Sequence, residues 1–162
     1  MKICVCSDSH GNTHGLRVML EQEKPDGLLF CGDGIEDFKS LPLPARWAMV
    51  KGNNDFFCDD PALYEDVWEG VRFVMLHGHR HSVKYTEDSV LSEAYGREVK
   101  VALYGHTHYQ KASWHGGLLL LNPGTMSRHN EYYAVLMLEK GNVDCELKRL
   151  MPRFGAEALR EF

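Results

Sequence analysis

The first third of the chain alternates short apolar runs with an amphipathic segment. Residues 2–7, which are apolar from Ile3 to Cys6, and the apolar run 27–31 are typical of buried strands. Between them lies a segment, about 13–23, whose apolar residues recur at helical spacing: Leu16, Met19 and Leu20. Asn12 or Thr13 can cap this helix. A strand, a helix and a strand in this order predict parallel pairing of the two strands.

The middle of the chain continues with short strands and a second helix. The apolar run at 47–50 predicts a strand, and the alternating runs 64–69 and 71–76 predict an antiparallel hairpin around Glu69-Gly70. Thr86 can cap a helix whose apolar stripe has four members: Val90, Leu91, Ala94 and Tyr95.

The last third of the chain is rich in strand patterns. We expect strands at five runs: 99–104, 110–114, 118–121, 132–139 and 143–149. Gly116-Gly117 and Gly141-Asn142 are turn sequences between them, and the tail from Pro152 to Phe162 can form one short helix. The pattern predicts a single α/β domain over 1–162 with two sheets.

Composition narrows the class of protein. The chain has 162 residues and a formal net charge of −5, which suits one domain and argues against non-specific nucleic-acid binding. It has no leader-like apolar segment and no apolar run of the roughly 20 residues that a membrane-spanning helix needs. The five cysteines lack CxxC spacing and are interpreted as free thiols. We therefore expect a cytoplasmic protein without a membrane partner.

Candidate chemistry gathers where the predicted strands end. Five stretches finish in metal-binding residue types: Asp8-Ser9-His10, Gly32-Asp33, Gly52-Asn53-Asn54-Asp55, His77-Gly78-His79 and Gly105-His106-Thr107-His108. Side chains two positions apart share a face of an extended chain, so Asp8 and His10 should point the same way, as should His106 and His108. Carboxylate, amide and imidazole donors in this number suffice for two metal ions, and four His favour Mn²⁺, Fe²⁺ or Zn²⁺ over Ca²⁺.

These five stretches, in this order, resemble the calcineurin-like metallophosphoesterase superfamily, and the short length resembles its small YfcE-type phosphodiesterases. The resemblance implies an αββα sandwich, an α/β fold of two mixed sheets flanked by helices. It implies two groups of metal ligands. The first metal would be held by Asp8, His10 and His108. The second would be held by Asn53, His77 and His106, with Asp33 bridging both.

The resemblance also implies a reaction. A hydroxide bridging two divalent metals would attack a phosphodiester in line, while the ions stabilise the negative charge that develops. Manganese is the expected ion, with iron, zinc or nickel as alternatives, and the substrate is expected to be a small phosphorylated molecule.

One position departs from the pattern of many relatives. They carry His where this chain has Asn54, which cannot be a general acid but can donate a hydrogen bond to a phosphoryl oxygen. We expect His79 to be the replacement acid and Asp55 to orient a His ligand. Asn12 could cap the first helix or contact substrate phosphate, and the turn 122–125 could be structural or face the substrate.

Three further readings stay open at this point. The same site could serve a phosphomonoesterase or a nucleotide pyrophosphatase. The superfamily also includes a retromer subunit that serves as a protein-interaction scaffold, so a non-catalytic role is an alternative. The sequence also leaves open whether the chain forms a homo-oligomer.

Overall fold

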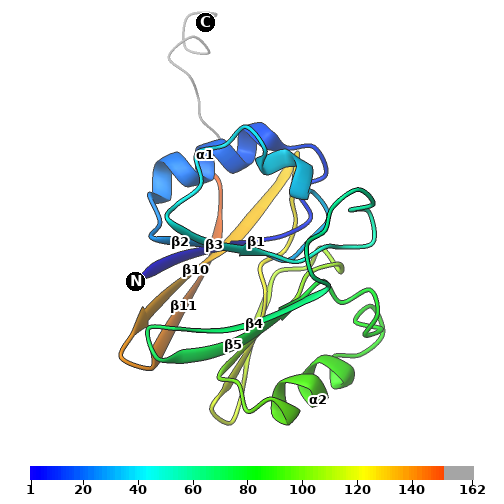
Figure 1. Ribbon diagram of the computed structural model, residues 1–162, viewed down its shortest axis with the longest axis vertical. Helices are drawn as coiled ribbons and strands as arrows, with labels where there is room; N and C mark the ends of the chain where they lie inside the picture. The colour runs from blue at the N-terminus through cyan, green and yellow to red at the C-terminus, as the bar shows by residue number, and fades with distance from the viewer. Residues whose placement is uncertain (152–162) are drawn as a thin grey trace, which may run out of the picture.

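The computed structural model describes residues 1–151 as two β-sheets packed face to face with a helix layer outside each of them (Figure 1). Helix α1 (Thr13–Glu23) and the short 3-10 helix η1 (Ile35–Phe38) cover the outer face of one sheet. Helix α2 (Asp88–Gly96) covers the outer face of the other. This αββα arrangement confirms the expected fold class.

The first sheet has six strands in the order β11-β10-β1-β2-β3, with β9 paired to β10 outside this path. Its strands are β1 (Lys2–Cys6), β2 (Gly27–Phe30), β3 (Arg46–Met49), β9 (Met126–Ser127), β10 (Asn130–Glu139) and β11 (Asn142–Arg149). Strands β1, β2 and β3 are parallel, whereas β10 runs antiparallel to both β1 and β11. The parallel pairing of β1 and β2 is the one predicted from the first third of the sequence.

The second sheet has five strands in the order β4-β5-β6-β8-β7. They are β4 (Leu63–Trp68), β5 (Val71–Leu76), β6 (Val101–Leu103), β7 (Lys111–His115) and β8 (Leu118–Asn122). Strands β4 and β5 form the predicted hairpin, and β5, β6 and β8 are parallel. Each sheet therefore contributes a block of parallel strands whose carboxyl ends meet at one edge.

The apolar run of β1 is continuous because both faces of this strand are buried. Ile3 and Val5 point into the core between the sheets, where they pack with residues such as Phe73 and Leu103. The alternate residues Cys4 and Cys6 point to the opposite face and pack under α1 and η1. A strand buried on both sides has little freedom to slip, so the residues that follow it are held firmly in place.

Several boundaries differ from the prediction. Helix α2 begins at Asp88 after Glu87, and the Thr86 hydroxyl accepts the Asp88 N–H at 3.2 Å. Tyr95 is 57% exposed and lies off the buried stripe. The strand expected over 99–104 shortens to β6 (Val101–Leu103). The elements η1 and β9 were not predicted, because such short elements carry no periodicity. The helix expected over 152–162 lies outside the described residues.

Within residues 1–151, no helix combines the length and the apolar character needed to cross a membrane.

Candidate metal centre

The predicted site residues gather at the edge where the parallel strands of both sheets end. The first sheet supplies them from the loops after β1, β2 and β3, and the second sheet from the loops after β5 and β6. Face-to-face packing of the sheets brings the two sets of loops together. The candidate residues from all five stretches therefore meet in one region, although they are spread along the chain from Asp8 to His108.

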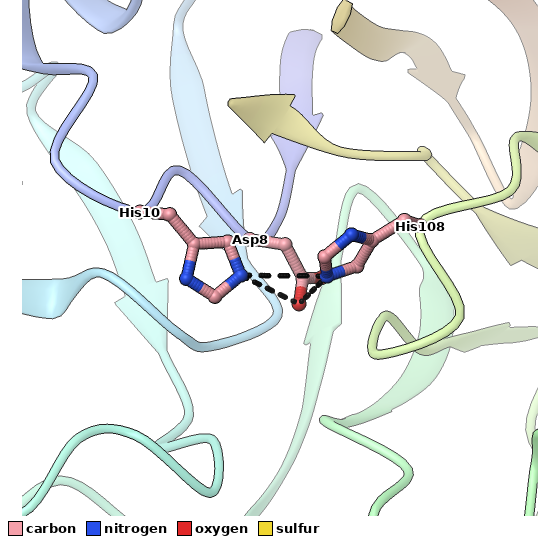
Figure 2. A group of neighbouring side chains, drawn as sticks. All are labelled: Asp8, His10 and His108. Atoms are coloured by element: carbon pink, nitrogen blue, oxygen red, sulfur yellow. Dashed lines mark hydrogen bonds and ion pairs between the residues drawn. The ribbon is translucent and has the colours of Figure 1, made fainter. Parts of the chain in front are cut away.

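One cluster consists of Asp8, His10 and His108 (Figure 2). The His108 Nε2 atom lies 3.2 Å from Asp8 Oδ1 and 3.3 Å from His10 Nε2, and His10 Nε2 lies 3.7 Å from the same carboxylate oxygen. Figure 2 shows the two imidazoles converging on this oxygen from opposite sides. Asp8 is fully buried, whereas both His side chains are exposed to solvent.

A second cluster consists of Asp33, His77 and His106. His77 Nε2 lies 3.3 Å from Asp33 Oδ2 and 3.2 Å from His106 Nδ1. The Asn53 side-chain oxygen lies 3.0 Å from the same His77 nitrogen, so Asn53 lies against this cluster. Asp33 and His77 are buried and His106 is half-buried, which makes this cluster less accessible than the first.

The two clusters adjoin each other. Asp8 Oδ1 lies 3.8 Å from His77 Nε2, and Asp33 Oδ2 lies 4.0 Å from His10 Nε2. Asp33 thus stands between a His of the first cluster and a His of the second.

A divalent ion fits each cluster by distance and by chemistry. Two ligands that each lie about 2.1 Å from one ion are separated by roughly 3.0–3.4 Å. The closest pairs of Asp and His donor atoms in both clusters are 3.2–3.3 Å apart, as such ligands would be. Asp8 Oδ1 is also buried without a hydrogen bond from any group in residues 1–151, so one carboxylate lone-pair position is left for a ligand. Each cluster could therefore hold a divalent cation.

The backbone carries several of these side chains in an uncommon conformation. Five of them lie in the left-handed region although none is glycine: Asp8 (φ 53°), His10 (φ 43°), Asp33 (φ 64°), His106 (φ 67°) and His108 (φ 66°). Such conformations cost energy and gather at functional sites. They also correct the expectation from alternation, because tight turns and not extended chain present these side chains. His106 and His108 consequently join different clusters.

Close backbone approach at the site requires glycine at two positions. A Cβ atom on Gly105 would lie 2.1 Å from the Ser7 hydroxyl, and one on Gly52 would lie 2.7 Å from the backbone nitrogen of Asp33. Any larger residue would push the loops of the two sheets, or the loops after β2 and β3, apart.

The electrostatic balance keeps both carboxylates ionised. Burial acts to raise the pKa of Asp8, but the imidazoles of His10 and His108 and the charge of His77 hold it well below its usual range. Burial likewise acts against ionisation of Asp33, and His77 lowers the pKa of that carboxyl below its usual value. In return Asp33 raises the pKa of His77 against the opposing effect of burial.

Asp55 has a structural role that differs from the one predicted. Its carboxylate accepts four backbone N–H groups, from Asp33 (2.7 Å), Gly34 (2.9 Å), Ile35 (3.1 Å) and Gly52 (2.7 Å). It therefore orients the loop that carries Asp33, and it does not orient a His. The group that fixes the His77 ring is the Cys31 carbonyl oxygen, 2.7 Å from Nδ1.

The residues predicted to bind substrate have well-defined partners. Asn54 donates its backbone N–H to Asp33 Oδ1 at 2.9 Å and a side-chain amide hydrogen to Asp33 Oδ2 at 3.0 Å. These two hydrogen bonds fix the orientation of the carboxylate that lies between the clusters. The Asn12 side chain accepts from the Gly15 N–H as the α1 cap. Its amide donates to the Met126 carbonyl and to Glu131, which leaves no amide hydrogen for a phosphate and corrects the predicted contact.

His79 lies beside the second cluster. Its ring centroid is 5.4 Å from that of His77 and 6.2 Å from that of His106. The Nδ1 atom is buried and finds no hydrogen-bond partner within the described chain. Burial, followed by the positive charges of His77 and Arg80, lowers the pKa of His79.

Sequence reasoning missed several residues that support the clusters. Ser9 and the Gly11 N–H donate to the Asp37 carboxylate on η1, at 2.6 Å and 2.8 Å, which fixes the loop that carries His10. Thr125 donates to the backbone oxygen of Asp8 at 2.8 Å. The turn 122–125 therefore has a structural role, because it holds the backbone of Asp8 in place. A Ser or Thr beside a candidate ligand was the one available signal, and it is too common to be diagnostic.

Two curated relatives carry sequence similarity over most of the chain. The probable metallophosphoesterase YsnB of Bacillus subtilis is 32% identical over 148 residues, which cover 86% of this chain and 85% of the relative. A protein of Methanocaldococcus jannaschii named as a phosphodiesterase is 29% identical over 146 residues, covering 76% and 83%.

Two solved structures show the same fold. A conserved protein of Streptococcus pneumoniae, described as a predicted phosphoesterase, superposes with a TM-score of 0.76 at 24% identity and covers 91% of this chain and 88% of its own. A zinc complex of Vps29 from Entamoeba histolytica superposes with a TM-score of 0.72 at 18% identity, covering 92% and 99%. At these identities the likeness concerns the fold alone.

The family comparison agrees with these relatives. The calcineurin-like phosphoesterase superfamily domain matches residues 1–141, the part of the chain that holds both clusters. The family binds divalent metals, and this chain brings two groups of metal-binding residues together where the family resemblance expects them. The chain belongs to the calcineurin-like phosphoesterase superfamily.

Proposed function

We propose that this protein is a phosphodiesterase that uses two divalent metal ions, with manganese the expected ion. The observation that carries the proposal is the pair of adjoining clusters with Asp33 between them, 3.3 Å from His77 and 4.0 Å from His10. When bound, two such ions supply Lewis acidity and an activated water for attack on phosphorus.

The chain's own residues prepare the site for that reaction. Asp8, His10 and His108 would hold one ion, and Asn53, His77 and His106 the other. Asp33 would bridge both ions, and Asn54 would fix the bridge through its two hydrogen bonds to that carboxylate. The second hydrogen of the Asn54 amide can donate to a phosphoryl oxygen of the substrate.

Asn54 also supports a diester over a monoester as the substrate. An amide cannot protonate a leaving group, so the chain lacks at this position the acid that a poor leaving group needs. His79 is the remaining candidate for that acid. The M. jannaschii relative that is named as a phosphodiesterase supports the same choice.

The test is hydrolysis of bis-p-nitrophenyl phosphate by metal-stripped protein before and after addition of Mn²⁺. We expect activity only after the metal is added. Asp33→Asn should lose at least one ion and lower turnover by more than about 100-fold. Asp144→Asn changes an exposed carboxylate on β11 and serves as the matched control. Full activity of the Asp33 variant would contradict the assignment of the site.

The competing reaction is hydrolysis of a phosphomonoester or a nucleotide pyrophosphate at the same site. A monoester and a diester with the same p-nitrophenol leaving group separate the two through kcat/KM. A higher kcat/KM on the monoester would reject the diesterase. Asn54→His should raise monoester turnover selectively, because it restores an acid beside the bridge.

A non-catalytic scaffold is the rival from another class, and Vps29 of E. histolytica shares the fold. All seven candidate ligand positions of this chain carry metal-binding residue types, which favours the enzyme. Metal content after supplementation decides between the two, since the absence of bound ions would favour the scaffold.

We also propose that the protein works in the cytoplasm. All five cysteines, which lie within residues 1–151, are free thiols, and Cys4, Cys6 and Cys31 are buried. This suits a reducing compartment.

A further inference from the structure

A hollow of about 510 Å³ is lined in part by Thr107, which lies in the chain between the candidate ligands His106 and His108, and we call it the Lys84 hollow. The residues that matter for the argument are Lys84, Glu87, Tyr104, Thr107, Tyr109 and Lys111. They come from the segment that leads into α2, from the segment between β6 and β7, and from the first residue of β7. None of them belongs to the metal clusters.

Thr107 joins the hollow to the candidate metal centre. It lies in the chain between His106 and His108, which belong to different clusters. Its hydroxyl accepts the Tyr109 N–H at 3.2 Å and an amide hydrogen of Asn122 at 2.9 Å, so this wall of the hollow is well fixed. A molecule with its phosphorus between the clusters would have the hollow as a neighbour.

The charges in the hollow leave one ammonium group uncommitted. Glu87 accepts hydrogen bonds from Lys111 at 2.9 Å and 3.0 Å and from the Tyr104 hydroxyl at 2.6 Å. Lys84 forms no hydrogen bond or ion pair with any group in residues 1–151. Two ammonium groups against one carboxylate make the hollow locally positive, although the chain as a whole carries −5.

Tyr109 supplies an exposed aromatic surface at the same place. Its side chain is 80% exposed, although its backbone is held to Thr107 immediately after His108. An anchored and exposed ring is suited to stack on a planar group of a ligand, and a nucleobase is such a group.

We infer that the Lys84 hollow binds the non-reacting arm of the substrate, and that this arm is a nucleoside carrying a second phosphate. The base stacks on Tyr109 and the second phosphate pairs with Lys84. This inference rests on the proposed phosphodiesterase function and names the substrate class of that same site.

The experiment compares three p-nitrophenyl diesters that release the same phenol. They are bis-p-nitrophenyl phosphate, the p-nitrophenyl ester of thymidine 5′-phosphate, and the same thymidine ester with a 3′-phosphate. We expect kcat/KM to rise from the first to the third. The 3′-phosphate should contribute about 5-fold, as an exposed ion pair does.

Variants assign each gain to its residue. Lys84→Gln should abolish the gain from the 3′-phosphate, so that kcat/KM becomes equal on the two thymidine esters. Tyr109→Ala should lower kcat/KM on both thymidine esters by on the order of 10-fold, while Tyr109→Phe keeps the ring and the activity. Lys24→Gln is the control, because Lys24 is an exposed lysine at the end of α1.

The outcomes separate the two proposals. Equal rates on the three esters, or equal losses in the Lys84 and Lys24 variants, would overturn the inference and leave the diesterase intact. If no diester is hydrolysed, the diesterase fails, and direct binding of thymidine 3′,5′-bisphosphate against thymidine 5′-phosphate still decides the inference. Tighter binding of the bisphosphate that Lys84→Gln removes supports it, and equal binding of the two nucleotides rejects it.

Discussion

Two buried carboxylates of this protein, Asp8 and Glu23, are surrounded in opposite ways. Asp8 is fully buried after β1, and its Oδ1 atom accepts no hydrogen bond within residues 1–151. Glu23 is 8% exposed at the end of α1, and both of its oxygens are occupied. The Lys148 ammonium and the Tyr133 hydroxyl each lie 2.5 Å from Oε1, and the Lys2 ammonium lies 2.7 Å from Oε2.

The difference separates a structural carboxylate from a functional one. Glu23 has cations of its own, which offset its desolvation and tie α1 to β1, β10 and β11. Asp8 faces imidazoles that can themselves bind a metal, so its neutralisation is left to a ligand. A fully paired carboxylate stabilises the fold, whereas a partly paired one is available for binding.

The largest expected effect is that of Asp8→Asn on activity. The variant keeps one oxygen for the hydroxyl of Ser7 and for the His106 N–H, but it turns an amide toward His10 and His108. We expect loss of bound metal and a fall in turnover of more than about 100-fold. The free energy of unfolding of the metal-free protein should change by less than about 1 kcal/mol. A large loss of stability with retained turnover would reverse the comparison.

A smaller effect on activity is expected from Asp55→Asn. The amide of the variant would face backbone N–H groups that the carboxylate now accepts, so the loop that carries Asp33 should loosen. We expect a loss of about 2 kcal/mol in the free energy of unfolding and a fall in turnover of about 10-fold. Asp59→Asn, on the same loop and exposed, is the control. An Asp55 variant with wild-type turnover would show that this loop does not need its four hydrogen bonds.

Glu23→Gln should affect stability and spare the reaction. It removes a charge that two half-exposed lysines and a buried tyrosine surround, so we expect a loss of about 2 kcal/mol in the free energy of unfolding. Turnover should stay within about 2-fold of the wild type. Glu23 contacts Lys2 at the start of β1, whereas the metal centre lies beyond the other end of this strand. Denaturant unfolding of the variant beside Glu139→Gln measures this effect. A matching loss in the control would assign it to net charge.

The smallest expected effect is a pH dependence of that same difference. Lys148, Lys2 and Tyr133 lower the pKa of Glu23 to about 2, against the opposing effect of burial, from an ordinary value of 4.5. A lowered pKa stabilises the fold fully above about pH 4.5, and this contribution is lost as the pH falls toward 2. The stability difference between the wild type and Glu23→Gln should therefore shrink to near zero over that window. A constant difference would exclude ionisation of Glu23 as its cause.

The sequence predicted the architecture well, for a physical reason. Runs such as 2–7 and 27–31 carry apolar residues on both faces, which is typical of strands that are buried on both sides. The positions of the candidate ligands follow from those runs, since parallel strands end at one edge. The resemblance to a known family then implied the grouping of the ligands, and in the structure His106 and His108 fall in different clusters.

The local geometry could not be predicted in the same way. Periodicity assumes regular backbone, but Asp8 and His10 sit in left-handed turns that side-chain alternation does not describe. The role of Asp55 depends on backbone N–H groups from two loops. The direction of a backbone N–H group cannot be predicted from the type of residue that carries it. Asn12 was ambiguous because one amide can cap a helix or bind a phosphate, and only the position of Glu131 decided between them.

Both candidate clusters draw side chains from both sheets. Asp8 and His10 follow β1 while His108 follows β6, and Asp33 follows β2 while His77 follows β5. An ion in either cluster would thus be a cross-link between the two halves of the sandwich. The melting temperature would then report the free concentration of the metal, since an ion at about 100 times its dissociation constant adds about 2.7 kcal/mol to the free energy of unfolding.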